Sequence, residues 1–396
     1  GGVCYIVSVG NYENNTFKPE IFKQGLKELE KIDEVTLLAI PDAATTLDAS
    51  KLGTVQQEML AQCRKLQDRF AILDVKTSAD SQNDFKEFRD NIGVNAIDYG
   101  AAYYPYIYTT YSIDFTFDDV IIKLNDKYNL IENFDSFFSH LNNNDKSIVK
   151  KVVLSVLENP KTPPKDSPDS EDPNIKEVKQ FEKQAIIQLI PYYKETLEKL
   201  VQESSLVPPS GAIAGIYAQN DNYVGVWKAP ANMSLAAVRG VSCLIDNQSQ
   251  EEMNISTTGK SINAIRPFSG KGILVWGART IHGNDNEWRY IPVRRLFIYV
   301  EESVKKSTEW AVFSPNTQNT WMKIKCQIEN FLINLWRAGG LAGATPQEAF
   351  YVNVGLGTTM DSQDILEGRL IVEIGMAASR PAEFVILRFS HKLQES

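Results

Sequence analysis

The chain has 396 residues, of which 43% are apolar and 23% are charged, and its formal net charge is −9. This composition is typical of a globular protein, and it excludes a small disulfide scaffold, a collagen-like fibre and a fully disordered chain. No uncharged apolar stretch of about 18 residues occurs, so no membrane-spanning helix is expected. The four cysteines form no C-x-x-C pair, and we expect free, reduced thiols.

Charge is unevenly divided along the chain. Residues 260–396 carry a net charge of +3, whereas residues 1–259 carry −12. This division favours an oriented partner that faces the basic portion. Basic runs with interleaved aromatic residues are missing, so nucleic acid is not an expected partner. The start at Gly1, without an initiating Met or a signal-peptide pattern, indicates the inside of a longer chain.

Residues 1–108 alternate between short apolar runs and segments with helical spacing. The runs predict strands at 3–9, 35–40, 70–75 and 100–108, and the spacing predicts helices at 20–30, 56–69 and 84–91. Continuous apolar strands separated by helices are typical of a parallel sheet covered on both faces. We therefore expect an α/β layer, with a parallel or mixed sheet and flanking helices.

The pattern changes between residues 109 and 209. Residues 160–174 contain five prolines and almost nothing apolar, a composition that cannot bury enough surface to fold. Helical spacing flanks this stretch at 146–158 and 175–203. We expect residues 109–209 to form an outward-facing helical insertion with a disordered loop at 160–174.

Residues 210–396 return to compact, glycine-punctuated, aromatic-rich sequence and predict an α+β domain. Pro292 suits the first turn of a helix to Ser307, in which Glu301 would pair with Lys305 and Glu302 with Lys306. A second helix is predicted at 320–338, and strands are predicted at 273–277, 370–376 and 383–389.

A search for catalytic and ligand motifs finds none that is complete. Residues 258–261 (TGKS) lack the first glycine of a phosphate loop, and no G-x-G-x-x-G or G-x-S-x-G occurs. The three histidines share no metal-ligand spacing. We therefore expect no nucleotide, cofactor or metal.

Asp42 and Asp74 carry the alternative hypothesis of an α/β enzyme. Both stand at or near the carboxyl ends of predicted strands, where such enzymes place catalytic carboxylates. Aspartates at these positions also cap helices and close turns, and that structural interpretation is favoured.

Arginine is frequent in the last part of the chain. Buried guanidinium groups need carboxylate or backbone partners, which could come from this chain or from a neighbouring subunit. The arginines are Arg279, Arg289, Arg294, Arg295 and Arg388, and the candidate acids are Glu287, Glu301, Glu373 and Glu383.

The same region carries a resemblance to a known family. The motifs at 261–268 (SINAIRPF), 274–280 (LVWGART), 287–290 (EWRY), 293–297 (VRRLF) and 380–386 (RPAEFVI) resemble the C-terminal domain of contractile tail sheath proteins. Further motifs resemble the sheath of phage-tail-like extracellular contractile injection systems of the antifeeding-prophage and virulence-cassette type. These lie at 68–74 (DRFAILD), 99–105 (YGAAYYP) and 225–231 (GVWKAPA).

The resemblance implies a structural subunit without enzymatic activity or cofactor. Such subunits assemble into a helical sheath of stacked rings around an inner tube, between a baseplate and terminal cap proteins. They contract without nucleotide hydrolysis and drive the tube through a target membrane, without inserting into it themselves. The particle would assemble in the bacterial cytoplasm and be released or membrane-anchored. Sheath paralogues are possible partners, and the tail sheath of a myophage virion is an alternative of the same class.

The resemblance also suggests roles for particular residues. Residues 210–396 would face the tube and polymerise. Candidate tube contacts are Lys305, Lys306, Lys323 and Lys325. Candidate inter-subunit strand residues are Glu383, Phe384, Val385, Ile386, Leu387, Arg388 and Phe389. Independently of the resemblance, the need of buried arginines for partners makes candidate structural ion-pair residues of Arg279, Arg289, Arg294, Arg295, Glu301 and Glu373.

Overall fold

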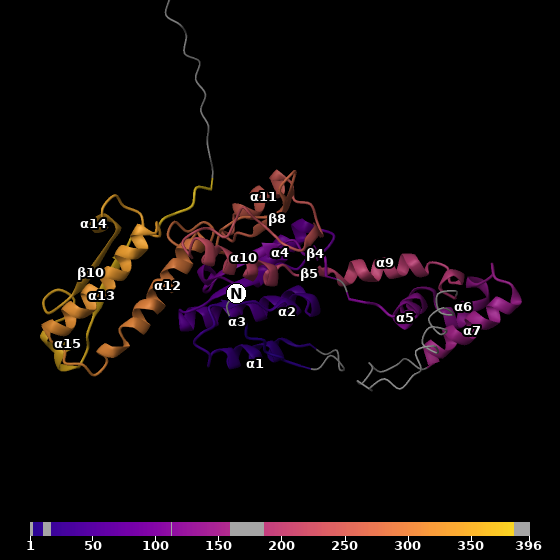
Figure 1. Ribbon diagram of the computed structural model, residues 1–396, viewed down its shortest axis with the longest axis horizontal. Coiled ribbons are helices and arrows are strands. Elements are labelled where there is room, and N and C mark those ends of the chain that lie inside the picture. Colours follow the sequence, from indigo (N-terminus) through magenta and orange to yellow (C-terminus); the bar gives the residue numbers. More distant parts are fainter. Residues whose placement is uncertain (1–2, 11–16, 112, 159–185, 384–396) are drawn as a thin grey trace, which may run out of the picture. The chain divides into compact units, whose positions relative to one another are not determined.

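The computed structural model describes residues 3–10, 17–111, 113–158 and 186–383. The chain divides into two compact units (Figure 1). Unit 1 comprises residues 1–107 and 208–396, and unit 2 comprises residues 108–207. The fold is mixed α/β, as the sequence predicts. Within the described ranges, no helix is both long enough and apolar enough to cross a bilayer.

Unit 1 is built on a six-stranded mixed sheet with the strand order β1-β2-β3-β8-β9-β6. The first four strands are parallel, whereas β9 runs antiparallel to both β8 and β6. Every residue of β2 and β3 is buried, which explains why these strands read as continuous apolar runs. The strands are β1 (Leu37–Leu38), β2 (Phe70–Asp74), β3 (Gly100–Tyr104), β6 (Met233–Ser234), β8 (Asn263–Phe268) and β9 (Gly272–Trp276), and a further short strand is β7 (Val238–Val241).

Helices flank this sheet. Helix α3 begins seven residues earlier than predicted because the Asp48 carboxylate caps it, accepting a hydrogen bond from the Lys51 N–H at 2.8 Å. Helix α1 packs beside it, and the buried Gln62 amide donates to the Leu26 carbonyl at 2.6 Å. The helices are α1 (Pro19–Leu29), α2 (Pro41–Thr46), α3 (Ala49–Leu66), α4 (Ser81–Asn91), η2 (Ile97–Tyr99), α10 (Ser210–Tyr223) and α11 (Asn247–Asn254).

The strand predicted at residues 3–9 is not formed. This segment lies against α1, where Val9 packs so closely that a Cβ added to Gly25 would sit 2.5 Å from its Cγ1 atom. Ile6, by contrast, is 90% exposed. The short strand β1 therefore ends the described sheet, and the apolar run packs on a helix rather than joining that sheet.

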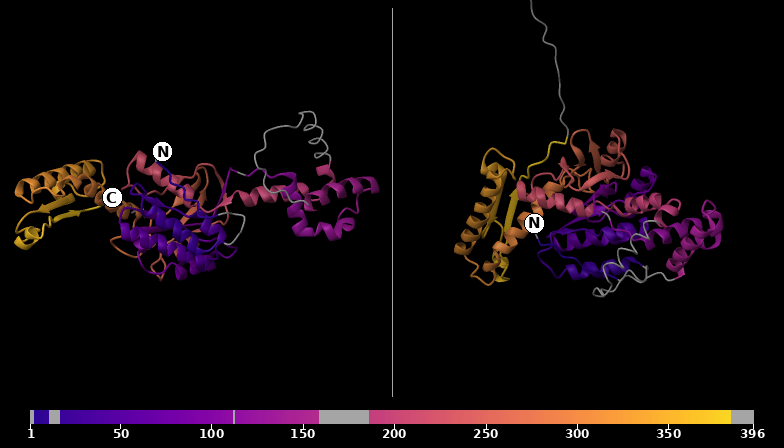
Figure 2. Two further views of the ribbon diagram at one scale, coloured as in Figure 1. Left: turned by 90° about the horizontal axis from the view of Figure 1, so that it is seen from below. Right: turned by 45° about the vertical axis from the view of Figure 1, so that its right-hand side comes forward.

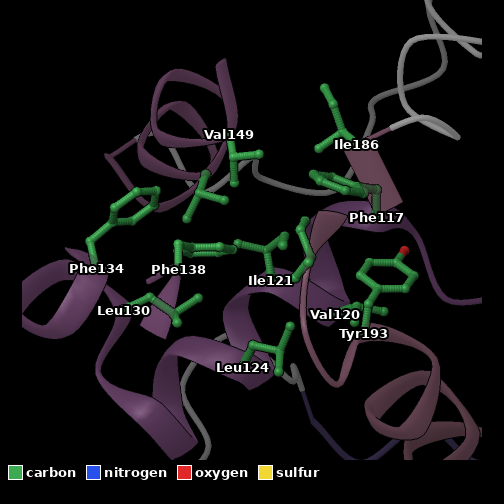
Figure 3. Packing of buried hydrophobic residues seen from close by; sticks show 12 residues of the cluster. Phe117, Val120, Ile121, Leu124, Leu130, Phe134, Phe138, Val149, Ile186 and Tyr193 are labelled. Carbon is green, nitrogen blue, oxygen red and sulfur yellow. The ribbon is translucent and has the colours of Figure 1, made fainter. Parts of the chain in front are cut away.

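Unit 2 is helical and has its own apolar core, shown in Figure 3. Ile121 of α5 lies beside Phe138, and Val120, Leu124 and Val149 belong to the same cluster; each of these five side chains is fully buried. At the base of the unit the Thr109 N–H donates to the Ser205 carbonyl at 2.8 Å, which holds the two ends of the segment together. The elements are β4 (Ile107–Thr109), α5 (Phe117–Tyr128), α6 (Leu130–Phe137), α7 (Asn143–Glu158), α9 (Tyr193–Ser204) and β5 (Leu206–Val207).

The helix predicted at 175–203 is not continuous. Helix α9 begins only at Tyr193, after Pro191 and after Tyr192, whose backbone adopts a left-handed conformation with φ of 59°. A proline in a helix interior removes a backbone hydrogen bond and clashes with the preceding turn. The loop predicted at 160–174 lies outside the described residues.

The last part of unit 1 forms a layer of two long helices and a strand pair, which we call the C-terminal layer (residues 291–376). Figure 2 shows α13 lying along the β10–β11 pair, and apolar side chains such as Leu332 and Val352 fill the space between them. Helix α12 spans the predicted range, and the positive φ of Gly339 follows the end of α13. The elements are α12 (Ile291–Ser307), η3 (Glu309–Ala311), α13 (Gln318–Arg337), α14 (Pro346–Ala349), β10 (Phe350–Val354), α15 (Ser362–Leu366) and β11 (Val372–Met376).

Candidate assembly site

Strands β10 and β11 form a sheet of only two strands. They pair antiparallel, from Phe350 opposite Met376 to Val354 opposite Val372. One face packs on α13, and Tyr351, which is 50% exposed, lies on the other. Within the described residues no third strand joins the pair, so both outer edges present backbone groups to which another strand can bond.

The hydrogen-bonding pattern identifies which groups point outward. The Ala377 N–H donates to the Ala349 carbonyl at 2.8 Å, so this is a hydrogen-bonded pair. Such pairs alternate with pairs whose N–H and C=O groups point away from the partner strand. The N–H of Ile374, opposite Val352, therefore faces the outer edge of β11.

The lysines predicted to contact a tube lie on α12 and α13, and their surroundings differ. Lys306 pairs with Glu302 at 2.9 Å, as predicted. Lys305, however, is nearest to Glu302 as well, at 3.9 Å, and not to Glu301. Burial raises the pKa of the Glu301 carboxyl, and nearby Arg294 partly offsets this rise. Although its carboxyl is partly desolvated, Glu301 as a whole is exposed, and the predicted Glu301–Lys305 pair is not formed.

The two lysines of α13 do not share a face. Lys323 is exposed, whereas Lys325 is partly buried and lies 3.8 Å from Glu329. Residues two apart on a helix point about 200° apart. One partner surface therefore cannot contact both side chains in the same way.

Two consecutive arginines in the first turns of α12 point into unit 1. Arg294 donates to the Asp98 carboxylate at 2.6 Å, and its guanidinium lies between the rings of Tyr99 and Trp288, at 3.7 and 4.1 Å. Its neighbour Arg295 forms a two-bond ion pair with Asp221, over the ring of Tyr217. The arginine side chains are only 9% and 8% exposed. These pairs attach the root of the C-terminal layer to η2 and α10.

Arg279 holds the carboxylate of Glu383. Its Nε and Nη2 atoms donate to the two carboxylate oxygens at 2.8 and 2.7 Å, and the Tyr290 hydroxyl donates to the same carboxylate at 3.2 Å. The Nη1 group donates to the carbonyls of Asn254 and Gly283. In the described chain Glu383 is thus an ion-pair residue in irregular backbone. The other six candidate strand residues, 384–389, lie outside the described residues.

The remaining candidate ion-pair residues have other contacts. Arg289 donates to the Asn286 side chain at 3.0 Å and lies over the ring of Tyr290. Glu373 on β11 accepts a long hydrogen bond from the Tyr351 hydroxyl at 3.4 Å. The partners Asp98 and Asp221 were missed by the sequence analysis, because no local pattern marks a carboxylate that meets an arginine far along the chain.

The two aspartates of the enzyme hypothesis have structural contacts. Asp74 is 3% exposed, and its Oδ1 accepts a hydrogen bond from the Ser210 N–H at the start of α10, at 2.7 Å. Burial raises the pKa of Asp74 to about 7, although the bond from Ser210 opposes the rise. Asp42 lies in the first turn of α2, where its carbonyl accepts hydrogen bonds from Thr45 and Thr46. Among the described residues no group of three or more His, Cys, Asp or Glu side chains could hold a metal ion.

The sequence and the structure resemble those of sheath proteins. Residues 283–392 match the phage tail sheath C-terminal domain family. The tail sheath protein of Vibrio phage KVP40 is 27% identical over 150 residues, which is 38% of this chain, and that of Enterobacteria phage T4 is 24% identical over 149 residues. The match spans only 22% of the length of each of these phage proteins.

Solved structures match over a larger share of the chain. A chain of the anti-feeding prophage (AFP) baseplate superposes with a TM-score of 0.63 and 29% identity, covering 99% of this chain and 77% of that chain. A chain of the PVC sheath complex of an extracellular contractile injection system, in the contracted state, gives a TM-score of 0.63 with 28% identity, covering 93% of this chain and 75% of that one. Residues 283–392 are therefore similar to a tail sheath C-terminal domain, and the chain has the fold found in the sheath of extracellular contractile injection systems.

Proposed function

We propose that this chain is a structural subunit of a contractile sheath, which polymerises around an inner tube and shortens to drive that tube through a target membrane. The observation that carries the proposal is the similarity to AFP and PVC structures over more than nine-tenths of the chain, at 28% to 29% identity. The two-stranded sheet of the C-terminal layer supports it, because its outer edges have no strand partner among the described residues and an unpaired edge needs one.

The proposed lattice is a helical polymer of identical copies. A heterologous contact that does not close into a ring generates a filament, and strand addition at the β10–β11 pair would supply directional backbone bonds between copies. Contraction would then be a rigid-body rearrangement between interfaces of different free energy, without nucleotide hydrolysis. Further proposed partners are the baseplate, terminal cap proteins and sheath paralogues. The proposed location is a phage-tail-like particle assembled in the bacterial cytoplasm.

Negative-stain microscopy of the purified chain tests polymerisation directly. Tubes or helical polymers are expected, whereas a monodisperse monomer that turns over a small molecule would favour the enzyme alternative. Replacing Ile374 with proline removes one outward N–H and should abolish polymers. The matched control Ile374→Ala loses a similar amount of packing but keeps the N–H, and it should still polymerise. Equal behaviour of the two variants would contradict strand addition at this edge.

We also propose that the C-terminal layer faces the tube through lysines of α12 and α13. Each exposed ion pair contributes about 0.2 to 1 kcal/mol, so many repeated copies would be needed for a firm grip. Replacing Lys323 and Lys325 together with glutamate should prevent assembly on the tube. Unchanged particle length and yield would refute the assignment.

The helical insertion has a different proposed place in the particle. We infer that residues 109–209 project outward, and that a chain lacking residues 160–174 assembles as the parent does. Loss of polymers on this deletion would show that the insertion takes part in the lattice.

A further inference from the structure

We propose that Glu383, seated against Arg279, is a positioning residue that fixes the point in unit 1 from which the C-terminal arm continues the chain. The C-terminal arm is defined here as residues 384–396, which follow Glu383. The inference rests on the proposed sheath function, since it concerns the arm that would carry the predicted inter-subunit strand. It is derived from the contacts of residues 377–383, which we call the strap.

The first part of the strap is bonded to the C-terminal layer. After β11 ends, the Ala377 N–H donates to Ala349 and its carbonyl accepts from the Ala342 N–H at 2.7 Å. The Ser379 N–H then donates to the Gly340 carbonyl at 3.2 Å. These bonds run along the segment that follows α13, so the strap is an extension of the β10–β11 layer up to this point.

The end of the strap is bonded to a different part of unit 1. The side chain of Arg279 is only 5% exposed and uses Nε, Nη1 and Nη2 as donors, with Nε and Nη2 on Glu383. The hydroxyl of Tyr290, the residue that precedes α12, also donates to this carboxylate. Tyr290 is held beside Arg279 because the two residues form an antiparallel backbone bridge. The socket for the carboxylate is therefore built from two segments that are held in register with each other.

The position of this socket gives the strap its function. Tyr290 precedes α12, whose first turns are held by the Arg294–Asp98 and Arg295–Asp221 pairs. The chain thus enters the C-terminal layer beside the Arg279–Tyr290 bridge, and the strap that follows the layer ends beside the same bridge. A pull on the C-terminal arm would pass through Glu383 into Arg279, whose backbone N–H donates to the side chain of Asn263 in β8, rather than into the edge of the β10–β11 pair.

A two-bond arginine–carboxylate pair suits this task better than apolar packing. It fixes orientation as well as distance, because the planar guanidinium meets both carboxylate oxygens. Removing the carboxylate would leave a buried guanidinium without its counter-charge, which is costly. The strap is therefore expected to stay seated while copies rotate against one another.

Hydrogen exchange on the monomer tests the anchor without relying on polymers. Glu383→Gln keeps the shape of the side chain and removes its charge. We expect the amides of Ala377 and Ser379 to exchange about ten-fold faster in this variant. Glu373→Gln is the matched control, because Glu373 is an exposed acid on β11 whose contact is a long bond to Tyr351, and it should leave exchange unchanged. Unchanged exchange in Glu383→Gln would overturn the proposal.

The critical concentration for polymerisation tests the positioning role. Glu383→Gln should raise it about ten-fold in the full chain but have no further effect in a chain that ends at Glu383, because the two changes disable the same element. If the substitution and the truncation instead raised the critical concentration independently, so that their effects multiplied, Glu383 would have a merely structural role and the proposal would be overturned. If Glu383→Gln fails to fold, Tyr290→Phe removes one donor to the same carboxylate and should shift both measurements in the same direction. If the parent chain forms no polymer, the proposed function fails, and the exchange experiment still decides the anchor.

Discussion

Unit 2 and the C-terminal layer of unit 1 are stabilised by different kinds of buried contact. The core cluster of unit 2 is apolar, and ion pairs such as Lys199–Glu195 lie on its surface with both side chains about half exposed. The C-terminal layer also has an apolar core, but Arg294 and Arg295 bury their charges at its root. Apolar burial is non-directional, whereas a buried arginine–carboxylate pair fixes an angle. The difference indicates that unit 2 needs only to be compact, while the C-terminal layer must be held in one orientation.

The largest expected effect is on unit 2. Phe138 is fully buried against Phe134 and Phe137, with ring centroids 4.4 and 5.0 Å away. Phe138→Ala should lower the free energy of unfolding of this unit by about 3–5 kcal/mol through lost burial and an unfilled cavity. Hydrogen exchange should accelerate in α5 to α7, while amides of β2 and β3 keep their protection.

The control for this experiment is an exposed apolar residue of the same unit. Ile131 is 56% exposed, and Ile131→Ala should change the free energy of unfolding by no more than about 0.5 kcal/mol. If Phe138→Ala accelerated exchange equally in both units, the two would form one cooperative structure and the comparison would fail.

The next largest effect is expected at the root of the C-terminal layer. Asp221→Asn leaves the 8% exposed Arg295 side chain without its counter-charge, at a cost of about 3 kcal/mol in the free energy of unfolding. Chemical denaturation of the variant and the parent measures the difference.

A paired substitution separates charge from packing at the same place. The double variant Arg295→Met with Asp221→Leu should recover most of the lost stability, because an apolar pair of similar volume avoids the desolvation cost. It should nevertheless polymerise less well, since it no longer fixes the orientation of α12. If the double variant polymerised as well as the parent, the Arg295–Asp221 ion pair would not be needed to fix the orientation of α12.

The fold class was predictable because burial leaves a pattern in the sequence. Strands buried on both faces appear in the sequence as continuous apolar runs, as β2 does. Amphipathic helices such as α12 and α13 are recognised by the spacing of their apolar residues. The run at residues 3–9 has the same composition but packs on α1, and composition does not reveal which neighbour an apolar segment finds.

The contacts of the candidate site were less predictable. Arg294 and Asp98 are 196 residues apart in sequence, and Arg279 and Glu383 are 104 apart. Such pairs depend on which distant segments become neighbours in the folded chain, and that information is tertiary. The alternating residues that follow Glu383 extend the predicted strand pattern back to it, whereas its ion pair with Arg279 leaves no local pattern.

A smaller effect is expected from Asp74, a buried carboxylate in unit 1 that accepts a hydrogen bond from the Ser210 backbone N–H and not from an arginine. Its pKa is raised to about 7 from an ordinary value near 4, so the folded state favours the protonated form. The stability from this proton is fully present below about pH 4 and is lost as the pH rises through about 7. Between pH 6 and pH 7 the parent should lose up to about 1.4 kcal/mol relative to Asp74→Asn. Parallel stability curves for the two proteins would contradict this assignment.

The smallest effect on stability is expected at the exposed lysines of α13, and it sharpens the contrast between buried and surface charge. Lys323→Glu and Lys325→Glu should each change the free energy of unfolding by less than about 0.5 kcal/mol, because exposed charges and partly exposed helix pairs contribute little. Since these side chains point to different sides of the helix, only the variant on the tube-facing side should reduce co-sedimentation with the inner tube protein. Lys325 already has Glu329 at 3.8 Å, so the larger loss is expected for Lys323→Glu. Equal losses would mean that the tube senses the overall charge of the layer, and unchanged binding in both variants would remove α13 from the proposed tube contact.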